Sequence, residues 1–169
     1  CKPVHLDFFK RTPDLEELIM EQDIVFVGGG NTKSMLAVWR DWGLDKLLKR
    51  AYKKGTIMCG VSAGAICWFD SGITDSWSSD LRLMNCLAFT KGVCCPHFDE
   101  EPERRPTVHR MIKNRDISEC IAIDGGCALH LIDEAPHASI VFSENKNAYC
   151  VSMESGVIDE SPYPSIKIF

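Results

Sequence analysis

The stretch CGVSAGAI, residues 59–66, places one serine between two glycines directly after an apolar run. Gly60, Ser62 and Gly64 form the pattern G-x-S-x-G, in which a sharp turn between a strand and a helix holds a serine hydroxyl at its apex. The flanking glycines remove side chains that would collide in so tight a turn. The pattern therefore predicts that Ser62 is a nucleophile, and the alternative is a small residue in a structural turn.

A second glycine-rich stretch, VFVGGGNTKS at residues 25–34, also follows an apolar run and precedes a helical pattern. It does not match a phosphate loop, because that motif needs a glycine before its lysine, where this chain has Thr32. A dinucleotide-binding loop fails as well, since a lysine stands where its third glycine belongs. The backbone N–H groups of Gly29 or Gly30, with that of Ala63, instead suit an oxyanion hole. A purely structural glycine turn is the alternative.

A serine nucleophile needs a base, and the candidate bases are the five histidines: His5, His97, His109, His130 and His137. His97 follows the extended apolar stretch GVCCP, from which a parallel strand would deliver its side chain to the carboxyl edge of the sheet. His130 lies in an apolar run and is expected in a sheet or core, whereas His109 is expected on the exposed face of a charged helix. His97 is therefore the predicted base.

The elements expected to position these residues alternate between strands and helices in the first half of the chain. Strands are expected over 4–9, 23–27, 56–61, 81–89, 92–96, 138–144 and 148–153, with two more around a glycine turn within 119–133, and helices over 12–22, 31–44, 45–55, 62–69 and 104–115. Thr12 would cap the first helix, with Pro13 at its first position. This order predicts an α/β fold with a mostly parallel central sheet flanked by helices, followed by a β-rich meander.

Composition limits the classes of function. A chain of 169 residues suits one domain, and a net charge of −5 gives no basis for binding nucleic acid. No run approaches the roughly 18 apolar residues of a membrane span, so no membrane partner is expected. The nine cysteines include no C-x-x-C pair and lie mostly in apolar runs, which favours free thiols in a reducing cytoplasm over a disulfide framework.

Three stretches together resemble the motifs of the S51 family of serine peptidases, which includes dipeptidase E and cyanophycinase. These are GGGNT at residues 28–32, GVSAGA at 60–65 and PHF at 96–98, and the similarity extends over most of the chain. Their order and spacing are far more specific than any one motif alone. The resemblance implies a class I glutamine amidotransferase-like (flavodoxin-like) sandwich with a nucleophile elbow.

The same resemblance implies roles for individual residues. Ser62 matches the nucleophile, His97 the general base, and Gly29 or Gly30 with Ala63 the oxyanion donors. The implied reaction is hydrolysis of a small peptide through an acyl-enzyme, without a metal or an organic cofactor. The rival interpretations are a cyanophycinase-like or other amide or ester hydrolase of this fold, and a binding protein that has lost the chemistry.

The resemblance also implies an acidic third member between the serine and the histidine in sequence. Asp70, Asp75 and Asp80 lie in this interval. Asp75 precedes His97 at the spacing of dipeptidase E, whereas Asp80 follows Ser62 at the spacing of cyanophycinase. Both residues stay open as the carboxylate that orients the imidazole, and Asp75 is favoured.

Two departures from the family pattern change these expectations. The stretch FDSGITD, residues 69–75, lacks the arginine with which dipeptidase E recognises an N-terminal aspartate, so strict specificity for aspartate is not expected. Arg82 offers a cation from another direction. The family also begins with an additional β-α unit, so residues 1–169 are expected to be a single domain that lacks this N-terminal unit and exposes a sheet edge.

The remaining expectations concern binding. Asn31 and Asp124 are the predicted substrate-binding residues, with Asp124 contacting a free amino group; an aspartate that forms a turn before glycines is the alternative. A metal site at His97, Asp99 and Glu100 is weighed against a solvated acidic loop, and no metal is expected. The chain is expected to be a monomer or a homodimer in the cytoplasm, acting on a small peptide substrate with no nucleic acid and no membrane partner.

Overall fold

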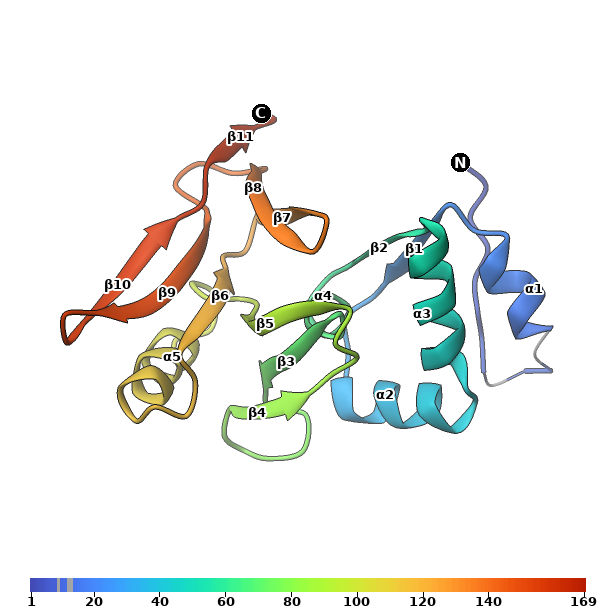
Figure 1. Cartoon of the computed structure of the whole chain (residues 1–169), viewed down its shortest axis with the longest axis horizontal. Coiled ribbons are helices and arrows are strands. Elements are labelled where there is room, and N and C mark those ends of the chain that lie inside the picture. The colour runs from blue at the N-terminus through green and yellow to red at the C-terminus, as the bar shows by residue number, and fades with distance from the viewer. Residues whose placement is uncertain (9, 12–13) are drawn as a thin grey trace.

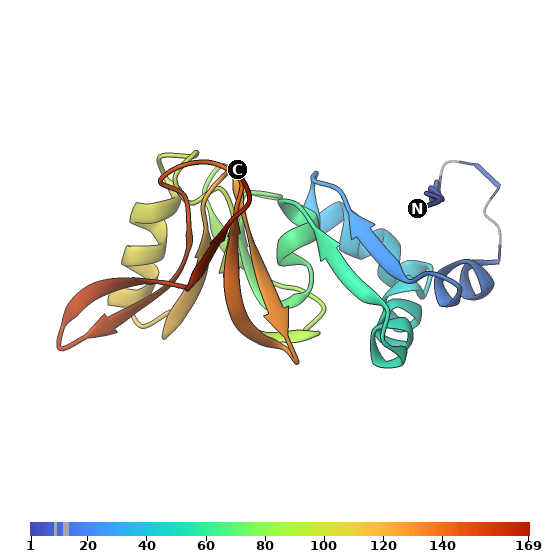
Figure 2. The ribbon, with the colours of Figure 1, turned by 90° about the horizontal axis from the view of Figure 1, so that it is seen from above.

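The structure, a computed structural model, describes residues 1–8, 10–11 and 14–169. Figures 1 and 2 show an elongated molecule with the N-terminal helices at one end and a C-terminal β-hairpin at the other. Its strands form three sheets of two, six and three strands. The predicted α/β class is confirmed.

The N-terminal half contains one parallel pair of strands and the helices that connect them. The elements are α1 (Leu15–Met20), β1 (Ile24–Val27), α2 (Thr32–Asp41), α3 (Leu44–Lys54) and β2 (Ile57–Gly60). β1 and β2 pair in parallel, with Val27 opposite Gly60. The predicted cap Thr12 and the predicted first helical residue Pro13 lie outside the described residues, and α1 is capped by Asp14, whose carboxylate accepts backbone N–H groups of the first turn.

The second half is built mainly from strands. The elements are α4 (Ala63–Ile66), β3 (Phe69–Thr74), β4 (Arg82–Asn85), β5 (Thr90–Cys95), α5 (Arg104–Lys113), β6 (Glu119–Ile123), β7 (Cys127–Ile132), β8 (Ala135–Val141), β9 (Ala148–Glu154), β10 (Val157–Pro162) and β11 (Ser165–Lys167). The six-stranded sheet has the order β10-β9-β6-β5-β3-β4, and the three-stranded sheet the order β11-β8-β7. In the large sheet β3, β5 and β6 pair with one another in parallel, whereas β4 pairs with β3, β9 with β6 and β10 with β9 in antiparallel fashion. The predicted parallel sheet is therefore matched in part.

Three local expectations differ from the structure. No described strand pairs with residues 1–8, so the strand expected over 4–9 does not form there, and Phe9 lies outside the described residues. The helix expected over 62–69 ends at Ile66, because the chain turns at once into β3. The last strand expected from the sequence ends at residue 153, whereas the structure has β10 and β11 after it.

Two apolar clusters hold these elements together. The first packs α2 and α3 around Leu36, Leu44 and Leu48, each at most 2% exposed, and continues to Trp68 and Phe89. The second lies between α5 and the large sheet. No helix in the described part of the chain is long and apolar enough to span a membrane.

All nine cysteines are free thiols, and five of them lie in the interior: Cys67, Cys86, Cys94, Cys95 and Cys120. Burial raises the pKa of Cys86 and of Cys95 to about 11, and it raises the pKa of Cys94 and of Cys120 well above the ordinary range. These side chains are protonated at neutral pH, so they pack as small apolar residues.

Candidate active site

The predicted nucleophile lies at a turn between a strand and a helix. β2 ends at Gly60 and α4 begins at Ala63, and Ser62 between them has φ 56° and ψ −116°. This conformation is rare for a residue with a side chain and stores strain. The Ser62 carbonyl accepts the N–H of Ile66 at 3.1 Å, which starts the helix immediately after the serine. The strand–turn–helix context that the motif requires is present.

The two glycines beside the serine are needed because backbone packs on backbone. A Cβ atom on Gly60 would lie 2.6 Å from the carbonyl oxygen of Val27 and closer still to that of Gly64. A Cβ atom on Gly64 would collide with the same Val27 carbonyl. Cβ atoms are essentially never found this close to backbone atoms, so both positions require glycine.

The glycine loop that follows β1 faces the serine. A Cβ atom on Gly29 would lie 3.3 Å from the Cβ of Ser62 and 3.9 Å from its Oγ. Gly30 has φ 147°, which glycine adopts readily. Ala63 is the first residue of α4, where backbone N–H groups have no partner within the helix. The geometry thus brings one predicted oxyanion donor, Gly29, directly beside Ser62.

Asn31, a predicted substrate-binding residue, is occupied by structural hydrogen bonds. Its Oδ1 accepts the N–H of Ser34 at 2.9 Å, which caps α2. Its Nδ2 donates to the carbonyl of Ser76 at 2.6 Å. Substrate binding by Asn31 stays a prediction, and the observed role is to fix the start of the helix behind the glycine loop.

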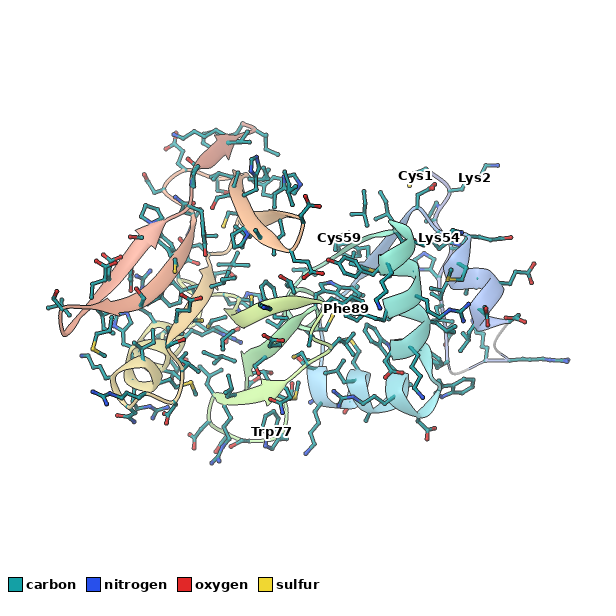
Figure 3. All side chains as sticks on the ribbon, in the orientation of Figure 1. Cys1, Lys2, Lys54, Cys59, Trp77 and Phe89 are labelled. Carbon is teal, nitrogen blue, oxygen red and sulfur yellow. The ribbon has the colours of Figure 1, made fainter. Side chains whose placement is uncertain are left out.

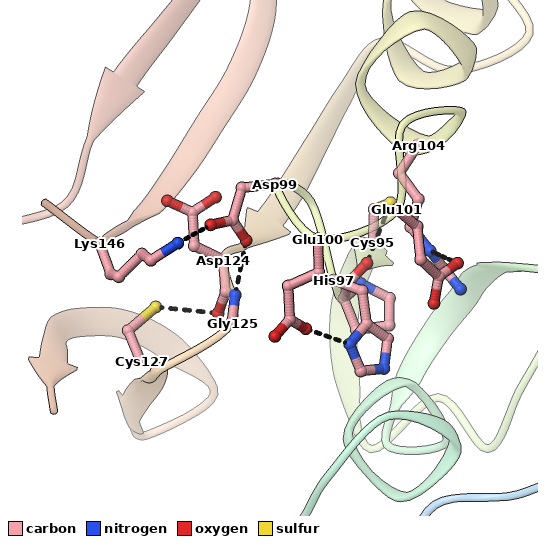
Figure 4. A network of polar contacts seen from close by, with 11 residues as sticks. Cys95, His97, Asp99, Glu100, Glu101, Arg104, Asp124, Gly125, Cys127 and Lys146 are labelled. Atoms are coloured by element: carbon pink, nitrogen blue, oxygen red, sulfur yellow. Dashed lines mark hydrogen bonds and ion pairs between the residues drawn. The ribbon is translucent and has the colours of Figure 1, made fainter. Parts of the chain in front are cut away.

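His97 follows β5 and Pro96, as the sequence predicts, and has a left-handed backbone with φ 53°. Its Nδ1 lies 2.7 Å from Oε2 of Glu100 (Figure 4). A carboxylate at Nδ1 fixes the orientation of the imidazole and stabilises its protonated form. Glu100 follows the histidine in the chain, whereas the family resemblance predicts an acidic residue that precedes it, so the sequence does not indicate this contact.

Glu100 fills a space that the opposite turn leaves open. A Cβ atom on Gly125 would lie 2.7 Å from Cγ of Glu100 and closer still to its carboxylate. Gly125 belongs to the turn between β6 and β7. Its missing side chain therefore makes room for the acid that holds His97.

The neighbours of Glu100 in sequence anchor the same turn. Asp99 accepts the N–H of Gly125 at 2.8 Å and forms an ion pair with Lys146. Burial raises the pKa of Asp99, but these hydrogen bonds outweigh it and the pKa is lowered. The Glu101 carboxylate accepts a hydrogen bond from Nε–H of the buried Arg104 at 2.8 Å. The acidic run is thus a set of individually partnered carboxylates, and the described residues contain no group of three or more side chains suited to a metal.

Asp75 and Asp80, the two predicted third members, lie elsewhere. Both line a groove of about 840 Å³ together with Trp77 and Arg82, and Figure 3 shows Trp77 at the lower edge of the molecule. No hydrogen bond or ion pair in the described part of the chain joins either aspartate to His97. The structure therefore does not bring them to the imidazole.

One cleft contains the serine and the histidine. Its volume is about 830 Å³, and Ser62, His97 and Glu100 all line it. Its walls include β2, the turn after β6, the tip of the β7–β8 hairpin, and Phe89, which Figure 3 labels near Cys59. Among the described residues no hydrogen bond joins Ser62 to His97, and such contacts often tighten only when substrate binds.

Asp124 also borders this cleft, but its side chain is only 5% exposed. Its carboxylate accepts the N–H of Asn147 at 3.2 Å, and Oδ1 is buried with no hydrogen-bond partner among the described residues. Figure 4 shows this carboxylate beside Asp99, on the other side of the turn from His97. Burial, and then the charge of Asp99, raise the pKa of Asp124. Its role with a substrate amino group stays a prediction.

Two other histidines, His109 and His130, lie outside the cleft. His109 is half-buried, and its Nε2 lies 2.6 Å from Glu160. His130 is in a strand, as expected, but is exposed and contacts the ring of His137. Neither residue lines the cleft.

A mixed α/β sheet that presents a serine on a strand–helix elbow near a histidine is typical of serine-type hydrolases. The chain belongs to peptidase family S51, whose sequence profile matches residues 1–139. It is 42% identical over 165 residues to the uncharacterized peptidase YgaJ of Bacillus subtilis (strain 168), a match that covers 97% of this chain and 71% of YgaJ.

A solved structure is similar in fold. It is the crystal structure of a candidate peptidase E from Listeria monocytogenes EGD-e, with a TM-score of 0.53 and 16% sequence identity. The match covers 88% of this chain and 64% of the Listeria chain, so this chain spans less than two thirds of that relative. The predicted S51 membership and serine-type peptidase class are confirmed.

Gly64→Ala tests the packing of the elbow. Because its methyl group would collide with the Val27 carbonyl, we expect a loss of roughly 3 kcal/mol or more in the free energy of unfolding, measured by chemical denaturation. Gly28→Ala is the matched control, because no atom lies within 4 Å of a Cβ at that position. Equal midpoints for the two variants would contradict the close contact between α4 and β1.

Asp124→Asn tests the cost of the buried carboxylate. The raised pKa means that Asp124 stabilises the fold when protonated, and that this contribution is lost as pH rises through the folded-state pKa. The variant should therefore be more stable than wild type at pH 7, on the order of 1 kcal/mol, with the gain shrinking toward pH 4. Thermal unfolding across this range measures it, with the exposed Asp116→Asn as control. A loss of stability at pH 7 would show that the charge is needed.

Proposed function

We propose that the chain hydrolyses small peptides, dipeptides among them, through a serine nucleophile. The observation that carries the proposal is that Ser62 on its elbow and the His97–Glu100 pair line one cleft. A volume of about 830 Å³ suits a ligand of a few residues rather than a folded protein chain.

In the proposed mechanism, His97 takes the proton of Ser62 as its Oγ attacks the peptide carbonyl carbon. The oxyanion forms against the glycine loop, where the N–H of Gly29 or Gly30 and that of Ala63 stabilise its charge. His97 then gives the proton to the leaving amine. Water, deprotonated by His97, attacks the acyl carbon; the bond to Oγ breaks, His97 returns the proton to Oγ of Ser62, and the second product leaves, with no cofactor taking part.

We assign the carboxylate partner of His97 to Glu100 in place of Asp75 or Asp80. The support is the 2.7 Å contact at Nδ1 and the space that Gly125 leaves for the acid. The carboxylate is half-exposed, so solvent weakens its electrostatic contribution and its main effect is to hold the ring.

A reducing compartment such as the cytoplasm is the proposed location. Its support is the set of nine free thiols, five of them buried in the sheet and its surroundings.

Ser62→Ala is the primary test. Removal of the nucleophile should lower kcat on a dipeptide library by at least about 10³-fold without changing the unfolding midpoint. Hydrolysis is followed by release of free amino acids. Activity that survives in Ser62→Ala at the wild-type rate would contradict the proposed nucleophile.

Glu100→Gln tests the assigned partner. Because the amide cannot stabilise a protonated imidazole, kcat should fall by roughly 10- to 100-fold with little change in KM. Glu103→Gln, an exposed residue three positions further on, is the control. Asp75→Asn and Asp80→Asn complete the series. A larger loss of kcat in Asp75→Asn or Asp80→Asn than in Glu100→Gln would show that this aspartate, and not Glu100, is the carboxylate partner of His97.

A further inference from the structure

The charges around the cleft have one sign. Apart from His97, its charged lining residues are all acidic: Glu100, Asp124, Asp133 and Glu134. No lysine or arginine is among the described residues that line it. Arg82, the cation that the sequence offered for an acidic substrate, lines the second groove and donates to Ser78 Oγ at 3.1 Å.

Two of the four carboxylates are not available to a ligand, because they already have structural contacts. Glu100 holds His97, and the carboxylate of Asp124 is buried beside Asp99. The negative charge available to a ligand therefore belongs to Asp133 and Glu134, both exposed at the tip of the β7–β8 hairpin.

The hairpin tip is held in place over the cleft. Thr90 Oγ1 donates to the carbonyl of Glu134 at 2.7 Å, and the Tyr52 hydroxyl donates to its Oε1 at 3.2 Å. Among the described residues neither Asp133 nor Glu134 forms an ion pair with a lysine or arginine. The Glu134 carboxylate is thus positioned by Tyr52, with the Asp133 carboxylate beside it in sequence, and neither is paired with a lysine or arginine among the described residues.

Aromatic rings complete this end of the cleft. Tyr52 and Phe89 line it and stack with their centroids 5.3 Å apart. The faces of these rings already attract a cation, since the Lys49 ammonium lies 4.5 Å from the Phe89 centroid. Lys49 does not line the cleft, and its ammonium donates to the carbonyl of Ala88. Carboxylates beside aromatic faces are the chemistry that recognises lysine and arginine side chains.

We propose that this cleft selects peptides that carry a positive charge, such as a lysine or arginine side chain, and discriminates against acidic peptides. The proposal rests on the peptidase function proposed above and names its substrate class. Because Asp133 and Glu134 are exposed, solvent reduces each contribution, and the expected preference per carboxylate is about threefold.

The test compares dipeptides of matched length: Lys-Leu, Gln-Leu and Glu-Leu, and the reversed set Leu-Lys, Leu-Gln and Leu-Glu. In at least one set, kcat/KM should be highest for the lysine peptide and lowest for the glutamate peptide. Equal or greater values for the glutamate peptides in both sets would overturn the proposal.

Binding of the same peptides to Ser62→Ala, measured by calorimetry, separates the two proposals. If no peptide is hydrolysed but lysine peptides still bind more tightly than glutamate peptides, the peptidase proposal fails and the charge preference stands. If hydrolysis depends on Ser62 but binding shows no preference for lysine, the charge preference fails alone.

A matched pair of variants locates the preference. Glu134→Gln keeps the size of the side chain and should lower the ratio of kcat/KM for the lysine peptide over the glutamine peptide by about threefold. Glu154→Gln, an exposed carboxylate at the end of β9 outside the cleft, should leave that ratio unchanged. Equal ratios in both variants and wild type would contradict the assignment to the hairpin tip.

Discussion

The close backbone contact of α4 with β1 is the constraint on which the candidate site depends. Because the Val27 carbonyl occupies the space where Gly60 and Gly64 would carry side chains, the helix lies directly on the strand. That contact forces Ser62 into its strained conformation at the apex. The same strand continues into the glycine loop, where Gly29 lies beside Ser62, so β1 positions both segments.

His97 is held by side-chain contacts of the loop that follows it, in which three successive carboxylates have three different partners. Asp99 ties the turn to Gly125, Glu100 binds His97, and Glu101 binds Arg104. Arg104 in turn donates to a carbonyl of β3. A turn fastened at these points keeps the imidazole at the edge of the cleft, although its backbone is in a left-handed conformation. An acidic run that resembles a solvated loop in sequence is thus partly exposed but held by specific partners.

The parts of the site that sequence predicts well are those encoded locally. The elbow around Ser62 needs only a strand, two glycines and a helix start, all of which are adjacent in the chain. The partner of His97 depends instead on how a turn folds back and on the empty space at Gly125, which no spacing rule reveals. Spacing favoured Asp75, yet β3 carries it to another groove. The strand directions are only partly predictable, because alternating patterns do not say that β4 pairs antiparallel with β3 or β9 with β6.

The interior thiols have a practical consequence for following this protein in solution. Cys94 is fully buried on β5, opposite Ile121 of β6, and Cys120, the residue before Ile121, is also fully buried. Their protonated sulfurs are inaccessible to alkylating reagents while the strands remain paired. The rate at which these two cysteines are alkylated therefore measures how often the strands of the large sheet separate. Native-state fluctuations can thus be followed without introducing a label.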